Sequence, residues 1–303
     1  MDPSYARLET EKINPATAMI DQCDTLSMVR LINDQDAHVA SAVRAEEKNI
    51  ADAIDIIVDR MKKGGRLIYF GAGTSGRLGV LDASECVPTF GVSPDLVLGF
   101  IAGGDRALRT PVENAEDNPD EGIRVIREAS VNHSDVICGI SASGGAPCVL
   151  GFLREGKRLG ATTIGLCTNP DAPLSPYCDV TIAPLVGPEV LTGSTRMKSG
   201  TAQKMVLNML TTCSMIRLGK AYGNMMVDLV ASNQKLKKRA LRLTMEATGA
   251  SEEKCAACLQ EADGHVKTAI LMVVSGMTAH EAKKLLAKHE GHLRKAIQQA
   301  MED

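Results

Sequence analysis

Short apolar runs alternate with helical patterns through the middle of the chain. Apolar residues recur at helical spacing from Ile50 to Met61, and five apolar runs that open into turns follow them. We interpret these runs as strands at Leu67–Phe70, Leu96–Ile101, Val136–Ile140, Thr162–Cys167 and Val180–Ala183. Helical segments such as 121–128 and 148–158 separate most of them. This alternation predicts an α/β fold: a five-stranded parallel sheet flanked by helices on both faces.

Both ends of the chain carry helical patterns without strands. We assign residues 1–56 to an N-terminal helical arm, 57–220 to the sheet domain and 228–303 to a small C-terminal helical module. Within this module, residues 249–270 align with 276–297 at an offset of 27 residues. Each unit of this repeat is predicted to form a helix, a Gly-His turn and a second helix.

The first predicted strand opens into a glycine-rich turn that is typical of anion sites. Gly71, Gly73 and Gly76 surround Thr74 and Ser75 and lead into a helix. The N–H groups of such a turn and helix N-terminus attract an anion, usually a phosphate. The glycines match the dinucleotide fingerprint, but the next strand ends without an acidic residue to bind a ribose. No Gly-Lys-Ser/Thr follows them either, so a sugar phosphate fits better than a nucleotide.

Two further segments carry hydroxyl groups beside glycines. Ser141, Ser143 and Gly144 follow the third predicted strand, and residues 187–204 precede a long helix. Because the carboxyl ends of parallel strands lie at one edge of a sheet, we expect the first two loops to lie together there. In the third segment Lys198 stands at the start of a helix, where the helix dipole disfavours a cation, so an anionic partner is indicated.

Two carboxylates accompany these loops. Glu85 follows the helix behind the first glycine turn, and Glu116 lies in an acidic loop. From the residues alone, Glu85 is equally well explained by a solvated helix face and by catalysis. For Glu116 a solvated loop is the default interpretation. The histidines are dispersed, so we expect no metal centre.

Composition argues against several other classes of function. Aromatic residues make up 3%, Trp is absent, and the net charge is −3, so no stacking platform or basic surface for nucleic acid is indicated. Nine scattered cysteines favour a reducing cytoplasm over a disulfide framework. The polar N-terminus does not resemble a signal peptide, and no apolar run approaches the roughly 18 residues of a membrane span. We expect a cytoplasmic protein without nucleic-acid or membrane partners.

Together these segments resemble the N-acetylmuramic acid 6-phosphate etherase family, which has the sugar isomerase (SIS) fold. Residues 9–15 are similar to the opening of the family, and 71–90 to its phosphate loop and first catalytic segment. Residues 187–204 are similar to a signature shared with glucokinase regulatory proteins. The resemblance covers nearly the whole chain. It implies cleavage of the D-lactyl ether of N-acetylmuramic acid 6-phosphate by elimination and hydration, with no cofactor and in a homodimer.

The resemblance also implies which residues form the site. Glu85 and Glu116 fall on the two catalytic glutamates, Glu85 as the acid at the lactyl oxygen and Glu116 as the base at C2. The implied substrate-binding residues are Gly73, Thr74, Ser75, Gly76, Ser141, Ser143, Gly144, Glu189, Ser194, Thr195 and Lys198. The second loop departs from the family pattern, because Gly145 and Ala146 stand where Arg and Thr are usual. The remaining hydroxyls and backbone N–H groups must then hold more of the phosphate.

Other functions stay open on the sequence. A sugar-phosphate-sensing regulator of the glucokinase type would carry two SIS copies, and a transcription factor would carry a basic helix-turn-helix, whereas residues 1–56 are not basic. An aldose–ketose isomerase of the same fold would need a base but no acid for a leaving group. A dehydrogenase is the weakest alternative. Release of lactate separates the etherase from the isomerase.

Overall fold

The computed structural model describes residues 8–228 and 234–302, which form two compact units. The first unit contains the described residues up to Ser84 together with Asp95–Thr211. The second contains Glu85–Pro94 and the described residues from Thr212 onward. Within the described ranges, no helix is both long and apolar enough to cross a membrane.

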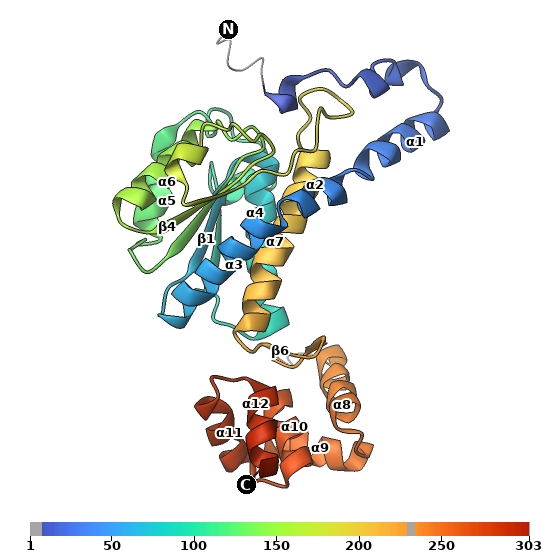
Figure 1. Cartoon of the computed structure of the whole chain (residues 1–303), viewed down its shortest axis with the longest axis vertical. Coiled ribbons are helices and arrows are strands. Elements are labelled where there is room, and N and C mark those ends of the chain that lie inside the picture. The colour runs from blue at the N-terminus through green and yellow to red at the C-terminus, as the bar shows by residue number, and fades with distance from the viewer. Residues whose placement is uncertain (1–7, 229–233, 303) are drawn as a thin grey trace. The chain divides into compact units, whose positions relative to one another are not determined.

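A five-stranded parallel sheet forms the centre of the first unit (Figure 1). Its strands are β1 (Leu67–Gly71), β2 (Val97–Ile101), β3 (Val136–Ile140), β4 (Thr162–Leu166) and β5 (Val180–Ile182). They are arranged in the order β2-β1-β3-β4-β5, and all neighbouring pairs are parallel. The predicted α/β fold is confirmed, and every predicted strand lies within one residue of its observed bounds.

Helices cover both faces of this sheet, α5 and α6 on one face and α3, α4 and α7 on the other (Figure 1). Their bounds are α3 (Glu47–Lys62), α4 (Gly73–Phe90), α5 (Pro119–Glu128), α6 (Pro147–Arg158) and α7 (Lys198–Arg217). Because both faces are covered, β1 and β3 are buried along their whole length, and the strands are mostly apolar rather than alternating, with threonines in β4 and β5. Side chains of β1 still point alternately to the two sides. The Phe70 ring lies 5.0 Å from Phe152 of α6, whereas Tyr69 packs against Gly79 of α4.

The N-terminal arm begins with three single 3-10 turns and continues into two helices. The turns are Glu9–Glu11, Pro15–Thr17 and Ile20–Gln22, and the helices are α1 (Thr25–Asp36) and α2 (Val39–Ala45). Figure 1 shows α1 projecting away from the sheet, and none of its residues is buried. Leu26 and Val29 of α1 are each 57% exposed, so the helix presents apolar side chains that its own unit does not cover.

The second unit ends in a module of five helices that follows a short hairpin. The hairpin strands are β6 (Ala221–Tyr222) and β7 (Met225–Met226), and the helices are α8 (Gln234–Thr248), α9 (Glu252–Glu261), α10 (Val266–Ser275), α11 (Ala279–Lys288) and α12 (Leu293–Glu302). The backbone conformation repeats at the same offset of 27 residues as the sequence. Gly264 and Gly291 have φ of +80° and +78°, and their N–H groups donate to the carbonyls of Leu259 and Leu286, both at 2.8 Å.

One carboxyl group is buried beneath the sheet of the first unit. Asp82 of α4 is 6% exposed, and Oδ1 of its carboxyl accepts a hydrogen bond from the Thr211 hydroxyl at 3.2 Å. Burial raises the pKa of Asp82 to about 6, and the hydrogen bonds from Thr211 and Tyr69 offset part of that rise. The folded state therefore prefers the protonated form of Asp82 more than the unfolded state does.

We predict that Asp82→Asn stabilises the protein increasingly as the pH rises from about 4 to 7. The unfolded carboxyl ionises near its ordinary pKa of 3.8, but the folded one ionises near 6, so native Asp82 lowers the free energy of unfolding across this window. Two pKa units correspond to about 3 kcal/mol. The measurement is urea unfolding of both proteins at several pH values. Parallel stability–pH curves for the two would contradict the prediction.

Candidate active site

The carboxyl ends of β1 and β3 open into a pocket of about 280 Å³. β1 has β2 on one side and β3 on the other, so the connections after β1 and β3 diverge and leave a crevice between them. The residues that line it come from both strand-end loops, from the N-terminal arm and from the segment before α7. They are Glu11, Ala72, Gly73, Thr74, Ser75, Glu116, Ile140, Ser141, Ala142, Ser143, Ala146, Gly193 and Thr195.

The first loop places the N-terminus of α4 at the pocket. A side chain at Gly76 would put its Cβ 2.4 Å from the Gly71 carbonyl oxygen, so the turn needs glycine there. Gly73 begins the helix with φ +53°. The Ser75 hydroxyl donates to Oε1 of Gln203 in α7 at 2.9 Å. This bond uses the Ser75 proton, so the groups of this loop that can donate to a phosphate are the Thr74 hydroxyl and the N–H groups at the helix N-terminus.

In the second loop, backbone N–H groups hold the serine hydroxyl oxygens. Ser141 Oγ accepts from the N–H of Gly144 at 3.1 Å, and Ser143 Oγ accepts from the N–H of Gly145 at 3.2 Å. The two oxygens are also 3.4 Å apart, so one hydroxyl can donate to the other, and the remaining hydroxyl proton can be donated to an anion. The Asn169 side chain fixes the loop by donating to the carbonyl of Ala142 at 3.0 Å.

Position 146 faces the pocket with a methyl group. Ala146 is 4% exposed, lines the pocket and is the N-cap residue of α6, where no side chain caps the helix. This is the position at which the resemblance led us to expect a threonine. At position 146 the structure therefore lacks both a hydroxyl that could donate a hydrogen bond to a phosphate and a side chain that caps α6.

We predict that Ala146→Thr tightens phosphate binding several-fold and stabilises the protein by about 1 kcal/mol. A threonine N-cap is typically worth about that much relative to alanine, and its hydroxyl can add a hydrogen bond to the anion. Inorganic phosphate binding and thermal unfolding measure the two effects. Ala146→Val, which has the same shape without the hydroxyl, is the control. Equal phosphate affinity of the Thr and Val variants would contradict the prediction.

The segment before α7 contributes unequally to the pocket. Thr195 lines it, whereas Ser194, Glu189 and Lys198 do not. Glu189 is fully buried and accepts the N–H groups of Lys198 and Ser199 at 3.0 and 2.9 Å, so its carboxylate caps α7. Lys198 is 2% exposed and donates to the Gln35 side chain at 3.1 Å. The two charged residues predicted to bind substrate thus hold this segment to the helix and the arm. Gly76 and Gly144 likewise shape their loops rather than line the pocket.

Glu116 lies in the pocket beside the second loop. Its backbone carbonyl accepts the N–H of Cys148 at 3.0 Å, which ties the acidic loop to the start of α6. The residue is exposed, yet the protein packed around its carboxyl group raises its pKa, and the neighbouring charge of Asp117 raises it further. A carboxylate with a raised pKa is a better general base near neutral pH than an ordinary one.

Glu85 is not among the residues that line this pocket. It is exposed, and it lies ten residues beyond Ser75 on α4, about 15 Å along the helix axis. That separation exceeds the reach of a glutamate side chain. Within one chain, the pocket therefore contains one of the two predicted catalytic glutamates.

The pocket also contains a carboxylate that is not among the predicted site residues. Glu11 of the N-terminal arm lines the pocket together with Glu116. The signal available in the sequence was its place in the segment 9–15, which resembles the opening of the family. Nothing in the sequence of residues 9–15 indicated that Glu11 lies beside the loops that follow β1 and β3.

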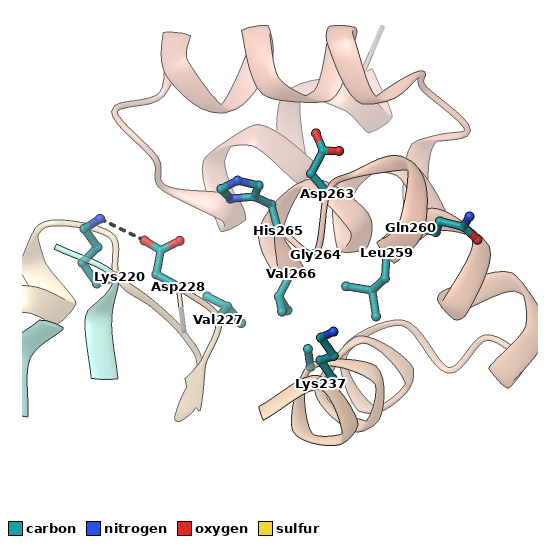
Figure 2. A pocket seen from close by; sticks show the side chains of 12 residues that line it. Lys220, Val227, Asp228, Lys237, Leu259, Gln260, Asp263, Gly264, His265 and Val266 are labelled. Atoms are coloured by element: carbon teal, nitrogen blue, oxygen red, sulfur yellow. Dashed lines mark ion pairs between the residues drawn. The ribbon is translucent and has the colours of Figure 1, made fainter. Parts of the chain in front are cut away.

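A second cavity, of about 830 Å³, lies in the second unit and is lined by none of the predicted site residues (Figure 2). Figure 2 shows Val227 beside Asp228, which forms an ion pair with Lys220 at 3.2 Å, and Val266 and Leu259 further along the lining. The smaller pocket is the candidate active site, because it joins the anion-binding loops to a carboxylate with a raised pKa.

Among the described residues, no group of three or more His, Cys, Asp or Glu is arranged to hold a metal ion.

A parallel sheet of this order binds its ligand at the switch point, where this chain carries hydroxyl-bearing loops, and family models assign the chain to the SIS domain. Models of the glucokinase regulatory protein N-terminal SIS domain and of the SIS domain match residues 49–157 and 122–213. The N-acetylmuramic acid 6-phosphate etherase of Aliivibrio fischeri strain MJ11 is 52% identical over 96% of this chain and 97% of its own. The N-acetylmuramic acid 6-phosphate etherase of Photorhabdus laumondii is 51% identical over 95% of this chain and 96% of its own length. The chain belongs to the N-acetylmuramic acid 6-phosphate etherase family. Among solved structures, a phosphoheptose isomerase from Francisella tularensis aligns with a TM-score of 0.48 and 16% identity, over 63% of this chain and 100% of its own.

Proposed function

We propose that this protein cleaves the D-lactyl ether of N-acetylmuramic acid 6-phosphate and yields N-acetylglucosamine 6-phosphate and D-lactate. The observation that carries the proposal is the pocket itself. Serine hydroxyls and the N-terminus of α4 line it beside Glu116, whose pKa is raised. Relatives about half identical over nearly the full chain bear the etherase name, which supports the same activity here.

The chemistry requires a base, an acid and a held phosphate. In the open-chain sugar, the C1 aldehyde acidifies the proton on C2. Glu116 removes that proton, and lactate then leaves C3 as its ether oxygen receives a proton from an acid. Water adds to C3 of the resulting unsaturated aldehyde and restores a hydroxyl group. The 6-phosphate, held by the hydroxyls of Thr74, Ser141 and Ser143 and by the α4 N-terminus, aligns C2 with the base.

We infer that the protein acts as a homodimer in which Glu85 of one subunit is the acid for the pocket of the other. The separation of Glu85 from Ser75 along α4 and its exposure support an acid supplied by a second copy. The uncovered apolar residues of α1, Leu26 and Val29, support the dimer itself. Nine free cysteines support a reducing, cytoplasmic setting.

The test is incubation of the purified protein with N-acetylmuramic acid 6-phosphate and measurement of D-lactate and N-acetylglucosamine 6-phosphate. We expect stoichiometric release of both. Formation of a ketose phosphate without lactate would instead indicate the aldose–ketose isomerase. Binding of a sugar phosphate without any turnover would indicate the regulatory protein.

A further inference from the structure

The start of the N-terminal arm is fixed against the loops that form the pocket. The N–H of Glu9 donates to the Asn169 side chain at 2.8 Å, and Asn169 also holds the second loop through Ala142. Further along, the Asn14 side chain donates to the Pro188 carbonyl at 3.1 Å, and the Thr17 hydroxyl donates to the Val190 carbonyl at 2.8 Å. These contacts join the arm to segments more than 150 residues away in the sequence. They place Glu11, which lies between them, at the wall of the pocket.

The carboxylate of Glu11 lies at this wall with a single weak contact, in which Oε1 accepts from the Thr10 hydroxyl at 3.5 Å. Its Oε2 lies 4.0 Å from the position that a Cβ on Gly193 would occupy, so the carboxylate packs against the edge of the Gly193 turn. The Lys12 side chain next to it pairs with Glu9 instead. Within the described residues, no ion pair involves Glu11, and the residues that line the pocket include no lysine, arginine or histidine.

The charges in the pocket restrict what Glu11 can contact. The serine hydroxyls and the α4 N-terminus suit a phosphate dianion, whereas Glu11 and Glu116 repel one. An ionised carboxylate has two oxygens that accept hydrogen bonds and no proton to donate. A sugar phosphate offers such a carboxylate the hydroxyl groups on the carbons between its phosphate and its reacting end.

We propose that Glu11 is a substrate-binding residue that accepts hydrogen bonds from these sugar hydroxyls and so orients the sugar above Glu116. This inference deepens the proposed function and rests on it. A charge-assisted hydrogen bond of this kind is stronger than a neutral one.

The test compares the binding of two phosphate esters to the full-length protein by calorimetry. N-Acetylglucosamine 6-phosphate carries the hydroxyls, and ethyl phosphate carries none. We expect Glu11→Ala to weaken the binding of N-acetylglucosamine 6-phosphate by about 10- to 100-fold and to leave the affinity for ethyl phosphate unchanged. Glu11→Gln, which keeps one acceptor oxygen, should recover part of the loss. Glu9→Ala, in the same turn, removes a carboxylate that pairs with Lys12 and should change neither affinity.

Equal loss for both esters would overturn the proposal, because it would mean that Glu11 only holds the arm in place. Unchanged binding of N-acetylglucosamine 6-phosphate to Glu11→Ala would overturn it as well. These outcomes are distinguishable from failure of the proposed function, since binding is measured without turnover. If the wild-type protein binds the sugar phosphate through Glu11 but releases no lactate, the etherase activity fails and the assignment of Glu11 as a hydroxyl-binding residue stands.

Discussion

Glu116→Gln is expected to reduce the release of D-lactate by about 10²- to 10⁴-fold, the usual contribution of a positioned general base. Glutamine has nearly the same shape but cannot take the C2 proton. Because proton removal precedes loss of lactate, exchange of the C2 proton with D₂O should disappear together with lactate release. The measurement is C2 exchange by NMR alongside a lactate assay. A Glu116→Gln protein that still exchanged this proton would contradict the assignment of Glu116 as the base.

Asp117→Asn is the matched control for this experiment. Asp117 is an exposed neighbour of Glu116, and its charge contributes to the raised pKa of the Glu116 carboxyl. Removing that charge should lower the pKa of Glu116, so the acid limb of the pH–rate profile should move to lower pH. The variant should remain active. A base is active when ionised, which fixes the direction of this shift.

A mixture of two inactive variants, Glu85→Gln and Glu116→Gln, is expected to regain about a quarter of the wild-type activity once the subunits have reassorted. If each pocket takes Glu116 from one subunit and Glu85 from its partner, a mixed dimer has one pocket with both glutamates and one with neither. Random reassortment makes half of the dimers mixed, and half of their pockets are complete. Each variant alone should lose about 10²- to 10⁴-fold, because each lacks one proton transfer.

The mixing experiment has a clear negative outcome. If the mixture stays as inactive as its components while co-purification through an affinity tag on one variant confirms mixed dimers, Glu85 does not serve the partner's pocket. The Glu85→Gln protein alone provides a second check. It should still exchange the C2 proton with D₂O, because the acid acts after the base. If exchange is lost in Glu85→Gln and retained in Glu116→Gln, the roles of the two glutamates are reversed.

Local signals were sufficient to predict the sheet. Each strand is a mostly apolar run bounded by glycine or polar turns, because both faces of a parallel sheet are covered. The loops behind β1 and β3 were predictable for the same reason. Hydroxyls and glycines that follow strands must lie at the carboxyl edge, whatever the details of packing. Thr74, Ser75, Ser141 and Ser143 accordingly line the pocket.

Charged candidates were harder to assign from the sequence. Glu189 and Lys198 carry charges that look suited to a substrate, but a buried carboxylate can equally cap a helix, as Glu189 does for α7. The type of residue does not distinguish these uses. What distinguishes them is the direction of the side chain, and that depends on contacts made between distant segments.

By itself, the sequence determined the α/β architecture, the anion-binding loops and the resemblance to an etherase family, because periodicity, turn chemistry and motifs are local properties. Tertiary structure decided which carboxylates share the pocket. Glu11 reaches it because hydrogen bonds join the arm to residues 169, 188 and 190. Glu85 does not line it, because α4 carries that residue about 15 Å beyond Ser75. Contacts over such sequence separations arise from the packing of the whole unit, and no local pattern encodes them.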